Sequence, residues 1–251
     1  MESKTQVLTE YTSRLKLSGI KERWEDIIKQ AEHDKLSYTD FSLMLLKAEI
    51  HYRDRKDMER RMKAAKLPLM HDLNQYDHTF NNGLSKQQLN QLRDCLWLEQ
   101  NFNLILMGPS GTGKTLIAAG LCYDALKNGY KAYFRTMEQL ADVLKLKDLT
   151  RSATTEYNRL IKAHLVVIDD IMMFSLNKQQ AVALFNFINN LHERASFIVT
   201  TNKSPEEWVK LLDDEVIATA ILDRLLYHCE VVKLDEKSYR LLNRKKIFET
   251  T

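Results

Sequence analysis

One octapeptide, GPSGTGKT at residues 108–115, constrains the fold of this chain more than any other feature. It follows the apolar run NLILM and matches G-x-x-x-x-G-K-[ST], a phosphate-binding loop that joins a strand to a helix. The glycines allow a tight turn whose backbone amides point inward at phosphate oxygens, and the following helix adds the partial positive charge of its N-terminus. A glycine-rich turn without a ligand is the alternative, and the lysine, the threonine and the preceding strand argue against it.

The loop assigns roles to its own residues. Lys114 is expected to reach the β- and γ-phosphates, and the Thr115 hydroxyl to bind Mg²⁺. ATP and Mg²⁺ are therefore the expected cofactors. The expected nucleotide-binding residues are Gly108, Pro109, Ser110, Gly111, Thr112, Gly113, Lys114 and Thr115.

Beyond residue 84, short apolar runs alternate with helical segments. The expected strands are 103–108, 131–137, 165–170, 196–202 and 230–234, and the expected helices lie near 115–127, 137–146, 154–163, 177–194 and 215–227. Strands separated by helices imply right-handed crossovers and a parallel sheet that is covered on both faces. The sequence predicts an α/β fold with a five-stranded parallel sheet and flanking helices.

The third expected strand, LVVIDD, ends in Asp169 and Asp170. Ligands of an open parallel sheet collect at the carboxyl ends of its strands, so both carboxylates are expected beside the phosphates. Asp169 is assigned to the metal and Asp170 to the water that attacks the γ-phosphate. Neighbouring side chains of a strand point to opposite faces, but at a strand end both can reach the same site. A pair of helix N-cap residues is the alternative interpretation.

The fourth expected strand, SFIVTTN, ends at Asn202 and should lie beside LVVIDD. That position would bring the Asn202 amide near the γ-phosphate and the attacking water. The segment lacks the aspartate of the Asn-Lys-x-Asp motif that reads guanine, so selectivity for GTP is disfavoured. A turn asparagine before Ser-Pro is the alternative.

Residues 1–66 are expected to form a small all-helical domain, because they contain one glycine, no proline and apolar residues at helical spacing. Ser37 and Asp40 form a capping pattern before a long helix. Its second half is rich in Lys and Arg, which fits either a solvated face with i,i+4 pairs or a surface that faces DNA. Residues 67–83 are the expected linker and 84–251 the expected ATPase domain.

Composition excludes other classes of protein. The formal net charge of +3 is compatible with a nucleic-acid partner without requiring one. The three cysteines are far apart and in no CxxC spacing, which argues against a disulfide framework and a zinc site. No apolar run is long enough for a membrane helix, and the chain start carries no apolar signal segment, so a cytoplasmic protein is expected.

These segments resemble the AAA+ ATPases, and specifically their IstB/DnaC-like branch. GPSGTGKT is similar to the Walker A motif, LVVIDD to Walker B and TTN to the sensor-1 strand, while LKLSGIKERW, KAAKLPLMHDLNQYD and AILDRLLYHCEVVKLDEKSYR resemble the IstB proteins in particular. The resemblance covers essentially the whole chain. It implies an ATPase that assembles side by side on duplex DNA with little sequence preference, with ATP between neighbouring subunits. It also implies a partner, an IstA-type transposase that this protein would help to choose its target site.

By the same resemblance, Arg224 matches the arginine finger that reaches the γ-phosphate of a neighbouring subunit. A local ion pair with Asp223 is the alternative. Arg240 is either a second sensor or part of a basic tail. The chain departs from the family pattern in having aspartate rather than glutamate at position 170, which predicts slow basal hydrolysis, and in ending too soon for a C-terminal lid domain.

Four basic residues are candidates for DNA phosphate contacts: Lys145, Lys147, Arg151 and Lys178. Solvated surface lysines are the alternative, and a helix-turn-helix within residues 1–66 is compatible with the pattern.

A replicative helicase loader of the DnaC/DnaI type would share the ATPase core. A P-loop kinase would need acceptor-binding arginines after the second strand, where only Arg135 and Arg151 occur. The remaining alternative is a scaffold that binds ATP without turning it over.

Overall fold

The structure is a computed structural model of the 251-residue chain, and it describes residues 3–77, 83–172, 175–212, 214–234 and 238–239. The chain divides into two compact units, Met1–Arg60 and Arg61–Thr251. We describe each unit by itself. The predicted boundaries at residues 66 and 83 remain predictions.

The first unit is helical. Its elements are α1 (Lys4–Arg14), α2 (Ser18–His33) and most of α3 (Tyr38–Ala65), whose last turn belongs to the second unit. Ser37 caps α3 as predicted, since its Oγ accepts the amide of Asp40 at 3.1 Å.

A buried glutamate of α3 joins this helix to the start of α2. The Glu49 carboxylate accepts the backbone amides of Gly19 at 2.7 Å and Ile20 at 3.2 Å, so it satisfies amides that a helix start leaves unpaired. Gly19 permits this approach, because a Cβ there would lie 2.5 Å from the carbonyl oxygen of Ala48. The contact between α2 and α3 therefore depends on one glycine and one buried carboxylate.

The second unit contains the sheet and its helices. Its strands are β1 (Asn103–Met107), β2 (Ala132–Thr136), β3 (Leu165–Asp169), β4 (Ser196–Thr201) and β5 (Cys229–Lys233). Its α-helices are α4 (Lys86–Arg93), α5 (Lys114–Lys127), α6 (Met137–Leu146), α7 (Arg151–Leu160), α8 (Lys178–Leu191), α9 (Pro205–Leu211) and α10 (Glu215–Leu226). The short 3₁₀ turns are η1 (Leu73–Gln75) and η2 (Leu96–Leu98).

All strand pairs of the sheet are parallel, and the strand order is β2-β3-β4-β1-β5. β4 lies between β3 and β1, so the strand that ends at Thr201 borders both the acidic strand and the strand that leads into the phosphate loop. The carboxyl ends of these strands meet at one edge, which is the edge predicted to bind the nucleotide.

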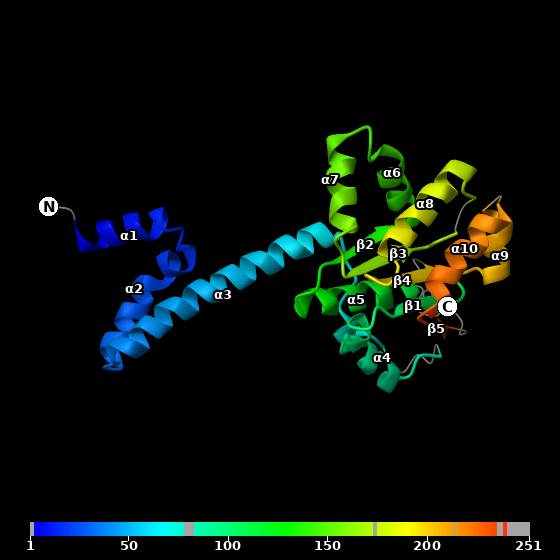
Figure 1. The fold of residues 1–251 in the computed structure, drawn as a ribbon. Helices are drawn as coiled ribbons and strands as arrows, with labels where there is room; N and C mark the ends of the chain where they lie inside the picture. Colours follow the sequence, from blue (N-terminus) through cyan, green and yellow to red (C-terminus); the bar gives the residue numbers. More distant parts are fainter. Residues whose placement is uncertain (1–2, 78–82, 173–174, 213, 235–237, 240–251) are drawn as a thin grey trace, which may run out of the picture. The chain divides into compact units, whose positions relative to one another are not determined.

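Helices cover both faces of the sheet (Figure 1). On one face α5 packs against β1 through β4. On the other face α6, α8 and α10 share a hydrophobic core with alternate strand residues, among them Val166, Ile168, Phe197 and Val199. β3 is buried along its whole length, which explains its apolar sequence without alternation.

The five predicted strands are confirmed, each within one residue at either end, and the parallel α/β fold is confirmed with them. The prediction missed two helices, α4 and α9. α9 begins with Pro205 in its first turn and a capping box between Ser204 and Glu207, a start signal that was interpreted as a turn. Within the described residues, none of the helices has the length and apolar character that spanning a bilayer requires.

Candidate functional site

The phosphate loop leaves β1 at Met107 and enters α5 at Lys114. The amide of Gly108 donates to the carbonyl oxygen of Thr201 at 3.1 Å, which ties the start of the loop to the end of β4. Gly113 caps the helix with φ of +97°, a left-handed conformation that favours glycine. Pro109 and Ser110 are exposed at the tip of the loop. The first turn of α5 therefore opens onto the loop, as an anion-binding helix start requires.

Gly111 is a second position of the loop that requires glycine. Its φ is +89°, and a Cβ at this position would lie 2.0 Å from the Oγ of Ser238, a residue that follows β5. The amide of Tyr239 donates to the Gly111 carbonyl oxygen at 3.0 Å. A segment after the last strand thus packs directly on the loop.

Lys114 is buried and its ammonium lies inside the loop. It donates to the carbonyl oxygens of Gly108 at 2.7 Å and Pro109 at 2.8 Å. The hydroxyl of Thr112, also buried, donates to the same Pro109 oxygen at 2.9 Å. These bonds hold the loop in a closed turn around a cation, which is the electrostatic requirement for a phosphate site.

Asp169 is the last residue of β3 and its side chain is only 5% exposed. Its carboxylate accepts the Thr115 hydroxyl at 3.0 Å and the Thr200 hydroxyl at 2.6 Å. Burial holds the pKa of this carboxyl above its ordinary value, although the two hydroxyl donors oppose that change. A hydroxyl and a carboxylate in contact are oxygen ligands of the kind that Mg²⁺ takes from proteins, so Thr115 and Asp169 fit the predicted metal role.

Asp170 takes a left-handed backbone conformation with φ of +56° and is exposed at the same edge. Its amide donates to the Thr200 Oγ1 at 2.8 Å. Its carboxylate makes no hydrogen bond or ion pair with the residues that the structure describes. Aspartate tolerates this backbone region better than most residues, and such residues gather at functional sites. The turn explains how two consecutive carboxylates reach one edge: one ends the strand and the other leaves it.

Asn202 follows β4 directly and is exposed in the bend before α9. The pairing of β3 with β4 confirms that this strand lies beside the acidic one. The structure thus places Asn202 at the edge that carries Asp170 and the phosphate loop. Its role toward a nucleotide remains a prediction.

Thr200 belongs to the site and was missed by the sequence reasoning. Its side chain is fully buried, and its hydroxyl contacts both Asp169 and the Asp170 amide. The only signal in the sequence was its place two residues before Asn202, in the same expected strand.

Arg224 does not join this group of residues. It lies on α10 and lines a small cavity of about 120 Å³ at the other edge of the sheet, where β1 and β4 begin. Asn103, Phe197, Tyr227 and His228 also line this cavity. Among the described residues Arg224 forms no ion pair, so the expected alternative of a pair with Asp223 does not apply. Instead, its guanidinium bonds Asn189 at 2.7 Å.

The four candidate DNA contacts differ in their surroundings. Lys145 and Arg151 are exposed. The ammonium of Lys147 lies 4.7 Å from the centre of the Tyr157 ring, and that of Lys178 lies 3.5 Å from a carboxylate oxygen of Asp214. Arg240, the candidate second sensor, lies outside the described residues.

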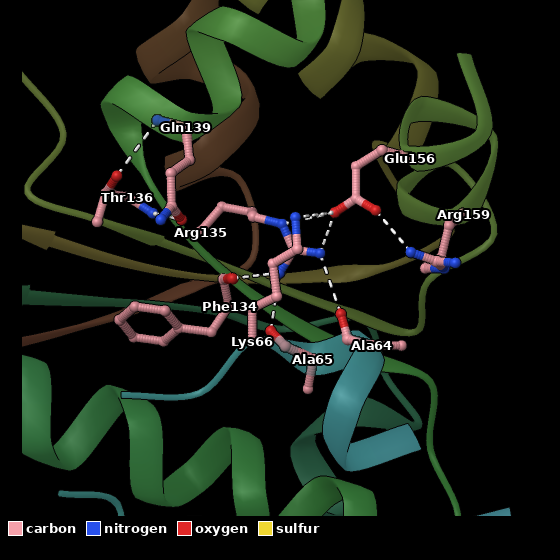
Figure 2. A network of polar contacts seen from close by, with 9 residues as sticks. All are labelled: Ala64, Ala65, Lys66, Phe134, Arg135, Thr136, Gln139, Glu156 and Arg159. Atoms are coloured by element: carbon pink, nitrogen blue, oxygen red, sulfur yellow. Dashed lines mark hydrogen bonds and ion pairs between the residues drawn. The ribbon is translucent and has the colours of Figure 1, made fainter. Parts of the chain in front are cut away.

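Arg135 is fully buried and forms a polar network, shown in Figure 2. Its guanidinium donates to the last carbonyl oxygens of α3, those of Ala64 at 3.1 Å and Ala65 at 2.7 Å, and it pairs with Glu156 of α7. Glu156 also accepts from Arg159 at 2.6 Å. Arg135 therefore caps the end of α3 and joins it to β2 and α7. Its guanidinium is engaged in this network and is not available to an acceptor substrate, which leaves exposed Arg151 as the other of the two arginines considered for a small-molecule kinase.

Comparison with known proteins identifies the family of this chain. The family described as IstB-like ATP binding protein matches residues 10–247 of the chain. An ATP-binding protein of an IS21-like insertion sequence from Bacteroides fragilis is 44% identical over 241 residues, which cover 96% of this chain and 92% of that protein.

Two solved structures share the fold. The DnaC helicase loader aligns with a TM-score of 0.53 and 20% identity over 66% of this chain and 97% of its own. AMPPCP-bound DnaA from Aquifex aeolicus aligns with a TM-score of 0.54 and 20% identity over 69% of this chain and 53% of its own, so the match spans about half of DnaA. At these identities the likeness concerns the fold alone.

Proposed function

This chain belongs to the IstB-like ATP binding protein family, and from that premise we propose that it is a Mg²⁺-dependent ATPase which assembles on duplex DNA and assists the transposase of its insertion sequence in choosing a target site. The observation that carries the proposal is the contact of Thr115, Asp169 and Thr200 beside the phosphate loop. It joins three segments distant in sequence into one oxygen-rich site next to a buried lysine.

The roles follow from this geometry. Phosphate oxygens of ATP would take the bonds that the Lys114 ammonium now gives to loop carbonyl oxygens. When bound, Mg²⁺ would offset the charge of the β- and γ-phosphates, held by Thr115 and Asp169. Asp170, exposed at the same edge, is the candidate to polarise the attacking water, and Asn202 to orient it.

Arg224 supports a role for assembly. The amino edge of the sheet, where it lies, is the edge opposite to its own phosphate loop. It would therefore act on the nucleotide of a neighbouring subunit, where a fixed guanidinium can offset transition-state charge. An arginine supplied in this way is worth roughly 10³ to 10⁵ in rate, so hydrolysis would depend on assembly.

The test measures phosphate release by the full chain with Mg²⁺ and ATP, across a range of protein concentrations, with and without duplex DNA. Release should rise steeply with both. Lys114→Ala should abolish ATP binding, whereas Asp170→Asn should bind ATP and DNA, release little phosphate and remain on DNA. Asp142→Asn, an exposed aspartate of α6, is the matched control and should behave like the parent.

Two results would count against the proposal. Phosphate release that is unchanged in Lys114→Ala and Asp170→Asn would show that the proposed site does not hydrolyse ATP. An Asp170→Asn protein that keeps full function would favour a scaffold that only binds ATP. A pull-down that recovers a replicative helicase and no transposase would favour a helicase loader, whose fold this chain shares.

A further inference from the structure

Three contacts restrain the side chain of Arg224. Its Nε donates to the Asn189 Oδ1 at 2.7 Å, its Nη1 donates to the Ala220 carbonyl oxygen at 3.0 Å, and its guanidinium lies 4.7 Å from the centre of the Phe185 ring. Its Nη2 makes no hydrogen bond with the described residues. One end of the guanidinium is thus fixed, and the other end is left to bind an anion.

We propose that Asn189 is a positioning residue for Arg224, and that helix α8 sets the direction in which this subunit offers its arginine to a neighbour. The inference rests on the proposed role of Arg224 in trans. Asn189 would not touch the nucleotide; it would act through the guanidinium.

The geometry of α8 supports this role. Phe185 and Asn189 are four residues apart, so they lie on the same face of α8, which packs against α10. Phe185 supports the flat face of the guanidinium while Asn189 accepts from its edge. Together they restrain the rotation of a long side chain, whose ordering would otherwise cost free energy when the arginine meets a phosphate.

The backbone around Arg224 is also attached to the sheet. Asn103, the first residue of β1, donates from its Nδ2 to the Leu225 carbonyl oxygen at 3.0 Å and accepts the Phe197 amide at 2.9 Å. These bonds hold the end of α10 against the amino ends of β1 and β4. The backbone of Arg224 is thus anchored to the sheet and its side chain to α8.

α8 is also the helix that follows the acidic strand. β3 ends at Asp169, and α8 begins at Lys178 with Asn177 as its cap. A shift of this helix in response to the subunit's own nucleotide would move Asn189, and with it the arginine offered to the next subunit. The arrangement gives a physical route by which hydrolysis in one subunit influences hydrolysis in its neighbour.

The first test compares Asn189→Ala with Asn189→Asp and with Asn190→Ala, a matched control on the same helix whose side chain is exposed. At saturating ATP and DNA, Asn189→Ala should lower kcat roughly tenfold, the effect of one lost orienting hydrogen bond, while the dissociation constant for ATP stays at the parent value. Asn189→Asp keeps the acceptor and should recover most of the rate. Asn190→Ala should match the parent.

The second test uses mixed assemblies. Asn189→Ala subunits have an intact nucleotide site and a misdirected arginine, whereas Lys114→Ala subunits have an intact arginine and no nucleotide. Mixing the two should give more phosphate release than the sum of the separate samples. In an Arg224→Ala background, Asn189→Ala should cause no further loss, because there is no arginine left to position.

The outcomes separate the inference from the function on which it rests. If Arg224→Ala itself leaves the rate unchanged, the proposed arginine role fails. If Arg224→Ala is slow but Asn189→Ala is as fast as the parent, or slows the Arg224→Ala protein further, only the positioning role fails. An Asn189→Ala protein that loses ATP affinity together with rate would indicate a general structural role and would also overturn the inference.

Discussion

Thr200 is uncharged and belongs neither to the phosphate loop nor to the acidic strand end, yet its hydroxyl contacts both aspartates of that strand end. It donates to the Asp169 carboxylate and accepts the Asp170 amide. One hydroxyl therefore orients the expected metal ligand and fixes the left-handed turn that presents the second carboxylate.

Replacing this hydroxyl by a methyl group in Thr200→Val should lower kcat roughly tenfold and raise the Mg²⁺ concentration needed for half-maximal rate, because Asp169 and Asp170 lose their common partner. Steady-state phosphate release against Mg²⁺ concentration measures both effects. Thr200→Ser restores the hydroxyl and should restore the rate. A Thr200→Val protein with the parent's rate and Mg²⁺ dependence would show that the contact is merely structural.

The buried carboxyl of Asp169 lowers the stability of the folded chain when no metal ion is bound. Burial raises the pKa of its carboxyl, so ionisation is harder in the folded chain than in the unfolded chain. The unfolded chain then loses its proton first as pH rises, and stability falls as pH rises from the ordinary value of 3.8 through the raised pKa.

Asp169→Asn removes this cost. At neutral pH and without nucleotide, the variant should be more stable than the parent by on the order of 1 kcal/mol, and the difference should vanish toward pH 4. With Mg²⁺ and ATP, the parent should gain stability and the variant should not. Denaturant unfolding at several pH values measures the first effect. A variant less stable than the parent at neutral pH would contradict the argument.

At the scale of elements, Arg135 shows how the last turn of α3 is attached to the rest of the second unit. Its fork donates to two carbonyl oxygens that a helix end leaves unpaired, and Glu156 offsets its charge (Figure 2). Burial lowers the pKa of this guanidinium, while the bonds to Glu156 oppose that change.

Arg135→Met should lower the free energy of unfolding by about 3–5 kcal/mol, because it leaves buried carbonyl oxygens and part of a buried ion pair without partners. Arg135→Lys should recover only a part, since an ammonium cannot form the fork. Arg159→Met is the control: Arg159 pairs with the same glutamate, but its side chain is 37% exposed, so its loss should cost about 1 kcal/mol or less. Equal losses in the two variants would contradict the capping role.

At the scale of the whole molecule, charge is nearly balanced at +3, so the proposed DNA binding would depend on where basic residues lie rather than on their number. Lys145 and Arg151 are exposed, while Lys178 has Asp214 for a partner. We therefore expect the first two to contribute more to phosphate contacts than the third.

Lys145→Gln with Arg151→Gln should weaken binding to duplex DNA of any sequence and reduce the slope of log K against log salt by about two, or one for each lost contact. Lys178→Gln should change the slope less. Fluorescence anisotropy over a salt series, with ATP and Mg²⁺ present, makes the comparison. If the double variant keeps the parent's slope, these residues do not face DNA.

The sequence alone was enough to predict the phosphate loop, the acidic strand end and the five parallel strands, because each has a signal in contiguous residues. These signals are a glycine pattern, an apolar run and a repeated alternation of strand and helix. It also identified the family, which the comparisons confirm. These features depend on local backbone preferences and periodicity, which neighbouring residues reveal without knowledge of the fold.

Only the tertiary structure decided which distant residues meet. Thr200 is 31 residues from Asp169, and Ala65 is 70 residues from Arg135 along the chain. Arg224 meets Asn189 only because α8 and α10 pack on the same face of the sheet. Such contacts arise from strand order and helix packing, and these depend on how the whole core is filled rather than on any segment taken by itself.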